Sequence, residues 1–182
     1  MQYRTCAIFT GAKFQVPGNV QRIDQAGTHG WQLRYGSGED GTLMFSDFTT
    51  DGSGAAAALE LAIKELHKRI RRLPAPTGLR KQPMSRKTTG HPAGISGPYL
   101  RNASKPGKTT YWCFQVSVPL PSGGSTTKSV YIGTEKTATV ERGEVALAKA
   151  IEIRNAAVEK YELAKTRSKR AAAAESLARQ QG

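Results

Sequence analysis

Three successive stretches decide the fold: GWQLRY (residues 30–35), TLMFSDFTTDG (42–52) and AAAALELAIKELHKRI (55–70). A similar series returns later in the chain as YWCFQVSV (111–118), SVYIGTEKTAT (129–139) and GEVALAKAIEIRNAAV (143–158). The tryptophans at 31 and 112 align, and the alanine- and leucine-rich stretches align behind them. An internal repeat of this kind predicts that one structural unit is used twice.

The periodicity of each stretch indicates its structure. Around each tryptophan, apolar and polar residues alternate, which is typical of a strand with one face packed on a core. The apolar members are Trp31, Leu33 and Tyr35, and then Trp112, Phe114, Val116 and Val118. In the third stretch of each series, large apolar residues recur at helical spacing. They are Leu59, Ile63, Leu66 and Ile70, and then Leu147, Ile151, Val158 and Tyr161. Asp51 and Thr139 are the candidates for helix N-caps.

A further short strand is expected before each tryptophan, near residues 18–25 and 94–103. The chain is therefore predicted to be an α+β protein with two copies of a three-stranded antiparallel sheet, each packed on one C-terminal helix. The predicted order is a first domain at 1–73, a basic linker at 74–93, a second domain at 94–165 and a basic helical tail at 166–182. The tail has strong helix propensity but few large apolar residues, so we expect an exposed extension of the second helix. One helix covers one face of a sheet, and the uncovered face is where function is expected.

The distribution of charge limits the class of binding partner. The formal net charge is +13 over 182 residues. The linker carries Arg80, Lys81, Arg86 and Lys87 without an acidic residue, and the tail carries four basic residues against one acidic residue. Basic segments that flank two positive units favour a polyanion, above all nucleic acid. The sequence contains no run of about 18 apolar residues, so no membrane span is predicted.

The sequence offers little for catalysis. Two cysteines and three scattered histidines do not suit a disulfide framework or a zinc finger, and a cytoplasmic, nucleoid-associated location is expected. The glycines at 36 and 38 lie between two predicted strands beside acidic residues, so they are not expected to cradle phosphate. His29, His67 and His91 have no evident carboxylate or nucleophile partner in the sequence. We expect no enzyme, cofactor, metal or small-molecule substrate.

Several motifs resemble the Apetala-two/ethylene-response-factor DNA-binding domain. The second copy carries Tyr131-Ile132-Gly133-Thr134 before a threonine-rich turn and an alanine-rich helix, preceded by Trp112-Cys113-Phe114-Gln115-Val116. Gly94-Ile95-Ser96-Gly97 looks like the opening of the family domain. In the first copy, Ser46-Asp47-Phe48 stands where the family has Gly-Thr-Phe, so the phenylalanine matches and the glycine does not. The resemblance covers roughly residues 18–70 and 94–160, and such domains occur in bacterial and phage proteins.

The resemblance implies a site on the sheets. The family inserts its three-stranded sheet into the DNA major groove, with the helix behind it and the outward strand residues on bases and phosphates. Carried over by alternation, the contacting residues of the second copy are Tyr99, Arg101, Gln115, Ser117, Ser129 and Tyr131. Those of the first copy are Gln21 or Arg22, Gln32, Arg34, Thr42 and Met44. Tyr131 replaces a tryptophan of the family, and Gln, Ser or Thr replaces several arginines, which implies fewer bidentate guanine contacts.

The chemistry of these side chains gives each a role. Arg34 and Arg101 suit guanine, Gln32 and Gln115 suit adenine, and Met44 suits a thymine methyl group. Lys105, Lys108 and Lys128 lie at strand ends and hairpins and suit phosphate contacts. In the linker, Arg80 and Arg86 either enter a narrow minor groove or belong to a simple tether.

These observations predict a DNA-binding protein that reads the major groove of double-stranded DNA through tandem sheets, as a transcriptional regulator, silencer or architectural factor. A monomer that uses both domains is compatible with the sequence, and the oligomeric state stays open. Two alternatives also stay open. One is an RNA-binding module that stacks single-stranded bases on Tyr99 and Tyr131. The other is a phage protein that binds and masks a host protein.

Overall fold

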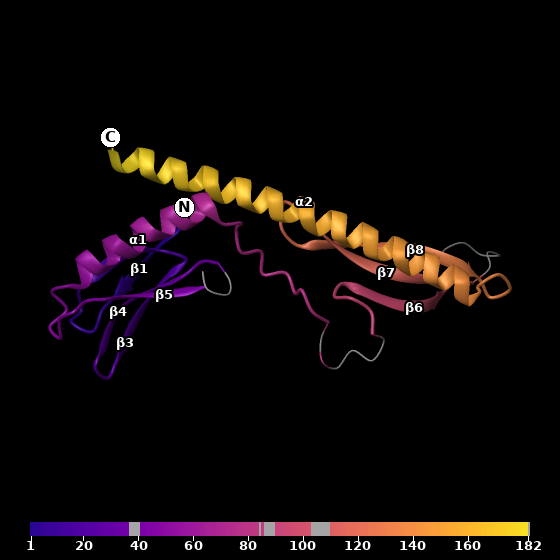
Figure 1. The fold of residues 1–182 in the computed structure, drawn as a ribbon, viewed down its shortest axis with the longest axis horizontal. Coiled ribbons are helices and arrows are strands. Elements are labelled where there is room, and N and C mark those ends of the chain that lie inside the picture. Colours follow the sequence, from indigo (N-terminus) through magenta and orange to yellow (C-terminus); the bar gives the residue numbers. More distant parts are fainter. Residues whose placement is uncertain (37–40, 84, 86–89, 103–109, 182) are drawn as a thin grey trace. The chain divides into compact units, whose positions relative to one another are not determined.

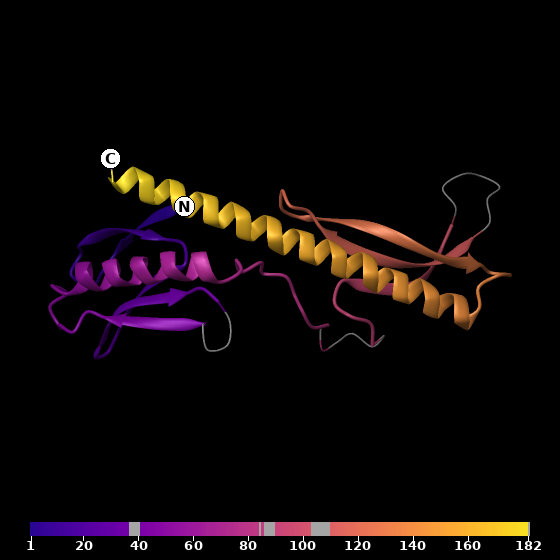
Figure 2. The ribbon, with the colours of Figure 1, turned by 45° about the horizontal axis from the view of Figure 1, so that its top comes forward.

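The computed structural model describes residues 1–36, 41–83, 85, 90–102 and 110–181 (Figures 1 and 2). Its elements are β1 (Tyr3–Ala7), β2 (Lys13–Pro17), β3 (Val20–Gln25), β4 (Thr28–Arg34), β5 (Thr42–Ser46), α1 (Ala55–Arg72), β6 (Ile95–Arg101), β7 (Tyr111–Pro119), β8 (Ser125–Thr134) and α2 (Val140–Gln181). The strands form three antiparallel sheets, β1–β2, β3–β4–β5 and β6–β7–β8. The α+β class is as predicted. The chain divides into a first unit, Met1–Thr77 with Lys165–Gly182, and a second unit, Gly78–Ala164.

The core of the first unit lies between the sheet β3–β4–β5 and α1. Trp31 is fully buried, as predicted, and its indole Nε1 donates a hydrogen bond to the carbonyl oxygen of Ala55 over 2.8 Å. Leu66 and Ile70 are fully buried beside it, which confirms the helical spacing expected of this segment. Arg69 of α1 donates to the carbonyl oxygens of Tyr35 and Gly41, so the helix holds both ends of the β4–β5 connection.

The β1–β2 hairpin was not predicted. Val16 of β2 and Ile8 beyond β1 are buried in the same core as Trp31. The Phe14 ring meets the Trp31 indole edge to face, with 5.7 Å between the ring centroids. The hairpin therefore adds apolar cover on the side of the sheet that α1 occupies. Its two strands have only five residues each and have no counterpart in the second copy, so the repeat gave no signal for them.

The two helix starts differ. Thr139 is confirmed as the cap of α2, because its Oγ1 accepts a hydrogen bond from the backbone N–H of Arg142 over 3.3 Å. Asp51 is wrong as the cap of α1, which begins at Ala55 after Gly54. The Asp51 carboxylate instead accepts bonds from the backbone N–H and the hydroxyl of Ser53, at 2.9 and 2.7 Å. Asp51 therefore stabilises the turn that precedes α1.

The second unit repeats the order of three strands and a helix. Its core contains Ile95, Phe114, Val116 and Val130, packed against Ala146 and Ala150 of α2. The predicted first strands of both sheets are confirmed as β3 and β6. Arg154 of α2 is buried and donates to the carbonyl oxygen of Ser117. Gly94 lies against this guanidinium with φ of +84°, so a side chain at this position would both strain the backbone and meet Arg154.

The last part of α2 belongs to the first unit. Ala173 is buried in the same core as Trp31. Lys169 Nζ donates to Asn19 Oδ1 over 2.8 Å, and Arg170 Nε donates to the carbonyl oxygen of Ile70 over 3.2 Å. The helical tail is therefore confirmed, but the expected exposure of this arm is wrong. Small alanine side chains let the helix approach closely, which compensates for the lack of large apolar residues.

The segment predicted as a linker has neither helix nor strand in its described residues. Its start packs on the first unit, because Ala75 is buried and its backbone N–H donates to Thr166 Oγ1 over 3.0 Å. Near its other end, His91 Nε2 lies 3.1 Å from the carbonyl oxygen of Gly97, and its ring meets Phe114 edge to face. The start of the segment is thus bound to the first unit, and its end is bound to the second unit.

Candidate nucleic-acid interface

The sheet β3–β4–β5 packs one face on α1 and exposes the other. The pairing register places Gln21, Gln32 and Met44 side by side across three strands, and Arg34 opposite Thr42. Cross-strand neighbours share a face, and this face is opposite to that of Trp31 because successive residues alternate. Gln32 is half-buried and the other four are exposed. We call these five residues the first open face. Four of them were predicted to lie there, and Gln21 was one of two alternatives for the fifth position.

Two of these side chains form a pair. Arg34 Nε donates a hydrogen bond to Gln32 Oε1 over 2.6 Å. The bond uses one lone pair of the amide oxygen and leaves the amide NH2 and the terminal guanidinium nitrogens as donors. A set of donors matches the two major-groove acceptors of guanine, N7 and O6. This geometry favours a joint role of the pair over the separate roles for guanine and adenine that the sequence suggested.

Arg22 is not part of the open face, which corrects one of the predicted contacts. The register pairs it with Trp31, on the side of the sheet that faces the core. Its guanidinium makes a two-pronged ion pair with Asp47, at 2.9 and 2.6 Å, and lies 5.0 Å from the centre of the Trp31 ring. The side chain is only 5% exposed, and that of Asp47 is fully buried. Of the alternatives Gln21 and Arg22, Gln21 is the outward residue.

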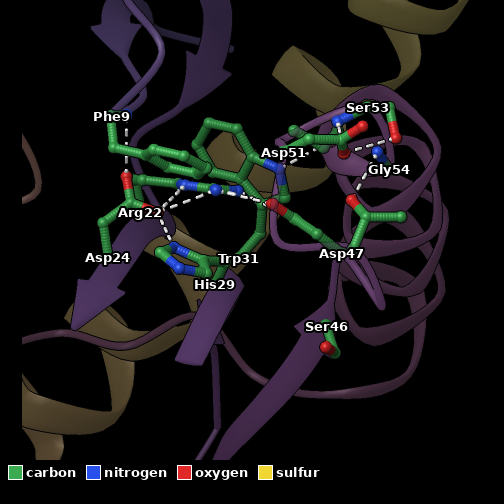
Figure 3. A network of polar contacts seen from close by, with 12 residues as sticks. Phe9, Arg22, Asp24, His29, Trp31, Ser46, Asp47, Asp51, Ser53 and Gly54 are labelled. Carbon is green, nitrogen blue, oxygen red and sulfur yellow. Dashed lines mark hydrogen bonds and ion pairs between the residues drawn. The ribbon is translucent and has the colours of Figure 1, made fainter. Parts of the chain in front are cut away.

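Arg22 belongs to a polar network at one end of the sheet (Figure 3). Asp24 accepts bonds from Arg22 Nε at 2.9 Å and from the backbone N–H of Phe9 at 3.2 Å, and its Oδ1 lies 3.0 Å from His29 Nδ1. Burial would raise the pKa of Asp24, but the hydrogen bonds from Arg22 and His29 outweigh it and lower that pKa. His29 therefore has a carboxylate partner that the sequence did not reveal. The network ties the β1–β2 hairpin to the sheet, which is a structural role.

The same network shapes the loop between β5 and α1. Asp47 anchors the loop through Arg22, and Gly54 packs on the carbonyl oxygen of Asp47. The next residue, Phe48, has a φ of +55°, which is rare for a bulky side chain, and its side chain is 91% exposed. The phenylalanine that matches the family motif is therefore not a core residue in this chain.

The sheet β6–β7–β8 also packs one face on its helix and exposes the other. Three cross-strand rows lie on the outward face. They are Ser96, Gln115 and Ser129; Tyr99, Cys113 and Tyr131; and Arg101, Tyr111 and Thr134. Ser117 and its partner Thr127 continue the face toward the β7–β8 turn. We call these eleven residues the second open face, and it includes each outward strand residue that the resemblance implied for the second copy.

Sequence reasoning missed one aromatic residue of this face. Tyr111 lies at the start of β7, and its ring centroid is 5.9 Å from that of Tyr131. The alternation that placed Gln115 outward places Tyr111 outward too, four residues earlier, so the signal was present. Arg101 lies nearby, with its guanidinium carbon 5.9 Å from the centre of the Tyr99 ring.

The residues predicted to contact phosphate lie in different parts of the chain. Lys128 is exposed, but the register pairs it with Val116, on the helix side of the sheet. Lys128 is therefore not part of the second open face, because the alternation of β8 turns it to the other side. Arg80 is exposed in the segment predicted as a linker. Arg86, Lys105 and Lys108 lie outside the described residues.

The described residues offer little for metal or membrane chemistry. Across them, no group of three or more His, Cys, Asp or Glu side chains is close enough to hold a metal ion. Neither α1 nor the described part of α2 contains an apolar stretch that could cross a bilayer. A cavity of about 690 Å³ lies along β8 and the first turns of α2. It is lined by Ser129, Val130, Tyr131, Ile132, Glu141, Arg142, Val145, Ala146, Lys149 and Ile153.

Comparison of the chain with models of protein families, with curated proteins and with solved structures yields no match. The likeness to the Apetala-two/ethylene-response-factor domain therefore rests on the short motifs and on the order of strands and helix.

Proposed function

We propose that the chain binds double-stranded DNA and lays the open face of each three-stranded sheet in the major groove. The observation that carries the proposal is the pattern found twice: one face of the sheet is buried under a helix, and the other carries mainly polar side chains, with Met44 on the first open face and three tyrosines on the second. A sheet of this width fits the major groove of B-DNA.

Charge supports the same partner. The net charge of +13 favours binding of a polyanion, and contacts to phosphates supply affinity that does not depend on sequence. The open faces themselves carry few charges, since Arg34 and Arg101 are their only charged members. Neutral donors and acceptors on the open faces of a positively charged chain suit the division between phosphate contacts that position and base contacts that specify. A regulator, silencer or architectural factor of transcription is the role that this division favours.

Charge reversal on and off the open face tests the proposal. We expect Arg101→Glu to weaken binding of the full chain to a duplex at least ten-fold, as measured by fluorescence anisotropy, because it places a carboxylate against the DNA. Lys160→Glu makes the same change in charge on an exposed residue of α2, and only a few-fold loss is expected. Equal losses for the two variants would reject the sheet as the binding surface.

Competition between nucleic acids tests the class of ligand. Duplex DNA should displace a labelled duplex from the chain at a lower concentration than single-stranded RNA does. A single strand that competes better than the duplex would favour an RNA-binding module instead. Binding to no nucleic acid, combined with a stable complex with one host protein, would favour the masking of that protein.

A further inference from the structure

The second open face differs from the first in chemistry. Tyr99 on β6 and Tyr131 on β8 both lie directly opposite Cys113 on β7. Cys113 is fully buried, whereas the two tyrosine side chains are 43% and 56% exposed. Tyr111 extends this row through its ring contact with Tyr131. We call Tyr99, Tyr111 and Tyr131 the tyrosine strip, and it spans all three strands of the sheet.

The residues around the strip are almost all neutral. Ser96, Gln115 and Ser129 form the next row, and Ser117 with Thr127 follows. Arg101 is the only charged residue of this face, and its guanidinium lies over the Tyr99 ring. Recognition of several guanines would need several arginine or lysine side chains. The second open face does not provide them.

The major groove offers one apolar group, the C5 methyl group of thymine. Aromatic rings bury such a methyl group, and neighbouring hydroxyl and amide groups can bond the thymine O4 and the adenine N6 and N7. We propose that the tyrosine strip recognises thymine methyl groups in the major groove, and that the second unit therefore selects A·T-rich duplex DNA. The inference rests on the proposed function and names the DNA that this unit prefers.

The ring contacts favour methyl recognition over stacking of single-stranded bases. Stacking needs an open ring face, but Arg101 lies over one side of Tyr99. Tyr111 and Tyr131 lean on each other with an angle of 43° between their planes. Ring edges and partly covered faces suffice to enclose a methyl group. Ring edges and partly covered ring faces are less suited to stacking against a flat base.

Duplexes that differ only in methyl groups test the inference on the full chain. The probes are an A·T-rich 24-base-pair duplex, the same duplex with deoxyuridine in place of every thymidine, and a G·C-rich duplex with and without C5 methylation of cytosine. Because burial of one methyl group changes affinity about four-fold, the thymidine duplex should bind at least four-fold more tightly than the deoxyuridine duplex. Methylated cytosine should likewise strengthen binding to the G·C-rich duplex.

Variants assign the effect to the tyrosine strip. Because Met44 on the first open face can also contact a thymine methyl group, Met44→Ser serves as the background for this test. In that background, the double variant Tyr99→Ser and Tyr131→Ser should reduce the ratio between the thymidine and deoxyuridine duplexes to about one. The corresponding Tyr→Phe double variant keeps the rings and should keep the ratio. Gln32→Ser lies on the other sheet, and it should weaken binding to both duplexes without a change in their ratio.

The outcomes separate this inference from the proposed function. If the wild-type chain binds both duplexes equally, methyl recognition is overturned, but duplex binding stands. If the ratio survives in the Tyr→Ser double variant, the tyrosine strip is not its source, and the inference is again overturned. If single-stranded oligothymidine binds more tightly than any duplex, both the inference and the proposed function are overturned.

Discussion

Two arginines on neighbouring strands, Arg22 and Arg34, show how strongly a residue's role depends on its side of the sheet. Arg34 lies on the first open face and bonds Gln32, whereas Arg22 is buried against Trp31 and bonds Asp47. Burial would lower the pKa of Arg22, but the hydrogen bonds to Asp47 and Asp24 outweigh it and raise that pKa. The charge of Arg22 thus stabilises the fold through its ion pair with Asp47.

Loss of Arg22 should therefore cost stability. We expect Arg22→Ala to lower the free energy of unfolding by about 3 kcal/mol or more, because it leaves the buried carboxylate of Asp47 without its partner. Arg34→Ala on the other face of the same sheet is the matched control, and its loss should stay within about 0.5 kcal/mol. Urea denaturation of the full chain measures both. Similar losses for the two variants would contradict the structural role of Arg22.

His67 predicts a pH dependence of stability. It is buried in α1, both ring nitrogens lack a hydrogen-bond partner among the residues that the structure describes, and burial followed by the nearby Arg71 lowers its pKa. In the unfolded chain, His67 takes up a proton near pH 6.5, and in the folded chain it does so only at lower pH. Its contribution to stability is therefore complete above about pH 6.5 and is lost as the pH falls below that value.

The measurement is the free energy of unfolding between pH 7.5 and 5. It should decrease toward pH 5 in the wild-type chain, and His67→Leu should flatten the curve because leucine binds no proton. If the dependence of the unfolding free energy on pH is the same in His67→Leu, groups other than His67 cause it.

At the scale of elements, the tail of α2 is the clearest test of packing. Ala173 is buried in the core of the first unit, and the next residue, Ala174, is exposed. We expect Ala173→Asp to destabilise the first unit by more than about 2 kcal/mol, because it buries a charge in an apolar contact. Ala174→Asp adds the same group toward solvent and should change little. Thermal unfolding followed by circular dichroism compares the two, and equal midpoints would mean that the tail is not packed.

The elements also show how far sequence reasoning reaches. Period-two alternation around Trp31 and Trp112 and helical spacing in the Ala-Leu segments predicted both three-stranded sheets and both helices, because each pattern reflects burial on one side. The same alternation placed the residues of both open faces. It left Gln21 and Arg22 undecided, since an arginine beside a buried carboxylate looks like a surface arginine in sequence. The β1–β2 hairpin was missed because its strands are short and lie outside the repeat. The packing of the tail depends on contacts between segments far apart in the chain, which no local pattern encodes.

At the scale of the whole molecule, the chain carries two candidate binding faces. If both engage one DNA molecule, the second contact forms at a raised effective concentration, and affinity exceeds that of either face alone. Deletion of a unit is a poor test, because the first unit includes residues from 165 onward. Variants of the full chain keep both units intact.

We therefore expect Arg34→Glu and Arg101→Glu each to weaken binding to a long duplex, and the combined variant to retain only weak, salt-sensitive binding. With about six phosphates contacted, the logarithm of affinity of the wild type should fall with the logarithm of salt concentration at a slope near −5. The combined variant should show a shallower slope. If one single variant abolishes binding and the other leaves it unchanged, only one face is used.

The discontinuous first unit has a consequence for synthesis on the ribosome. Residues 78–164 emerge as a contiguous segment, so the second unit can form as soon as Ala164 has left the exit tunnel. Translation must proceed beyond Ala173 before the first unit has all of its core, although most of that unit was made earlier. A ribosome that stalls between the two points would release a product with a finished second unit and an incomplete first one, and such a fragment would be an early target for proteases.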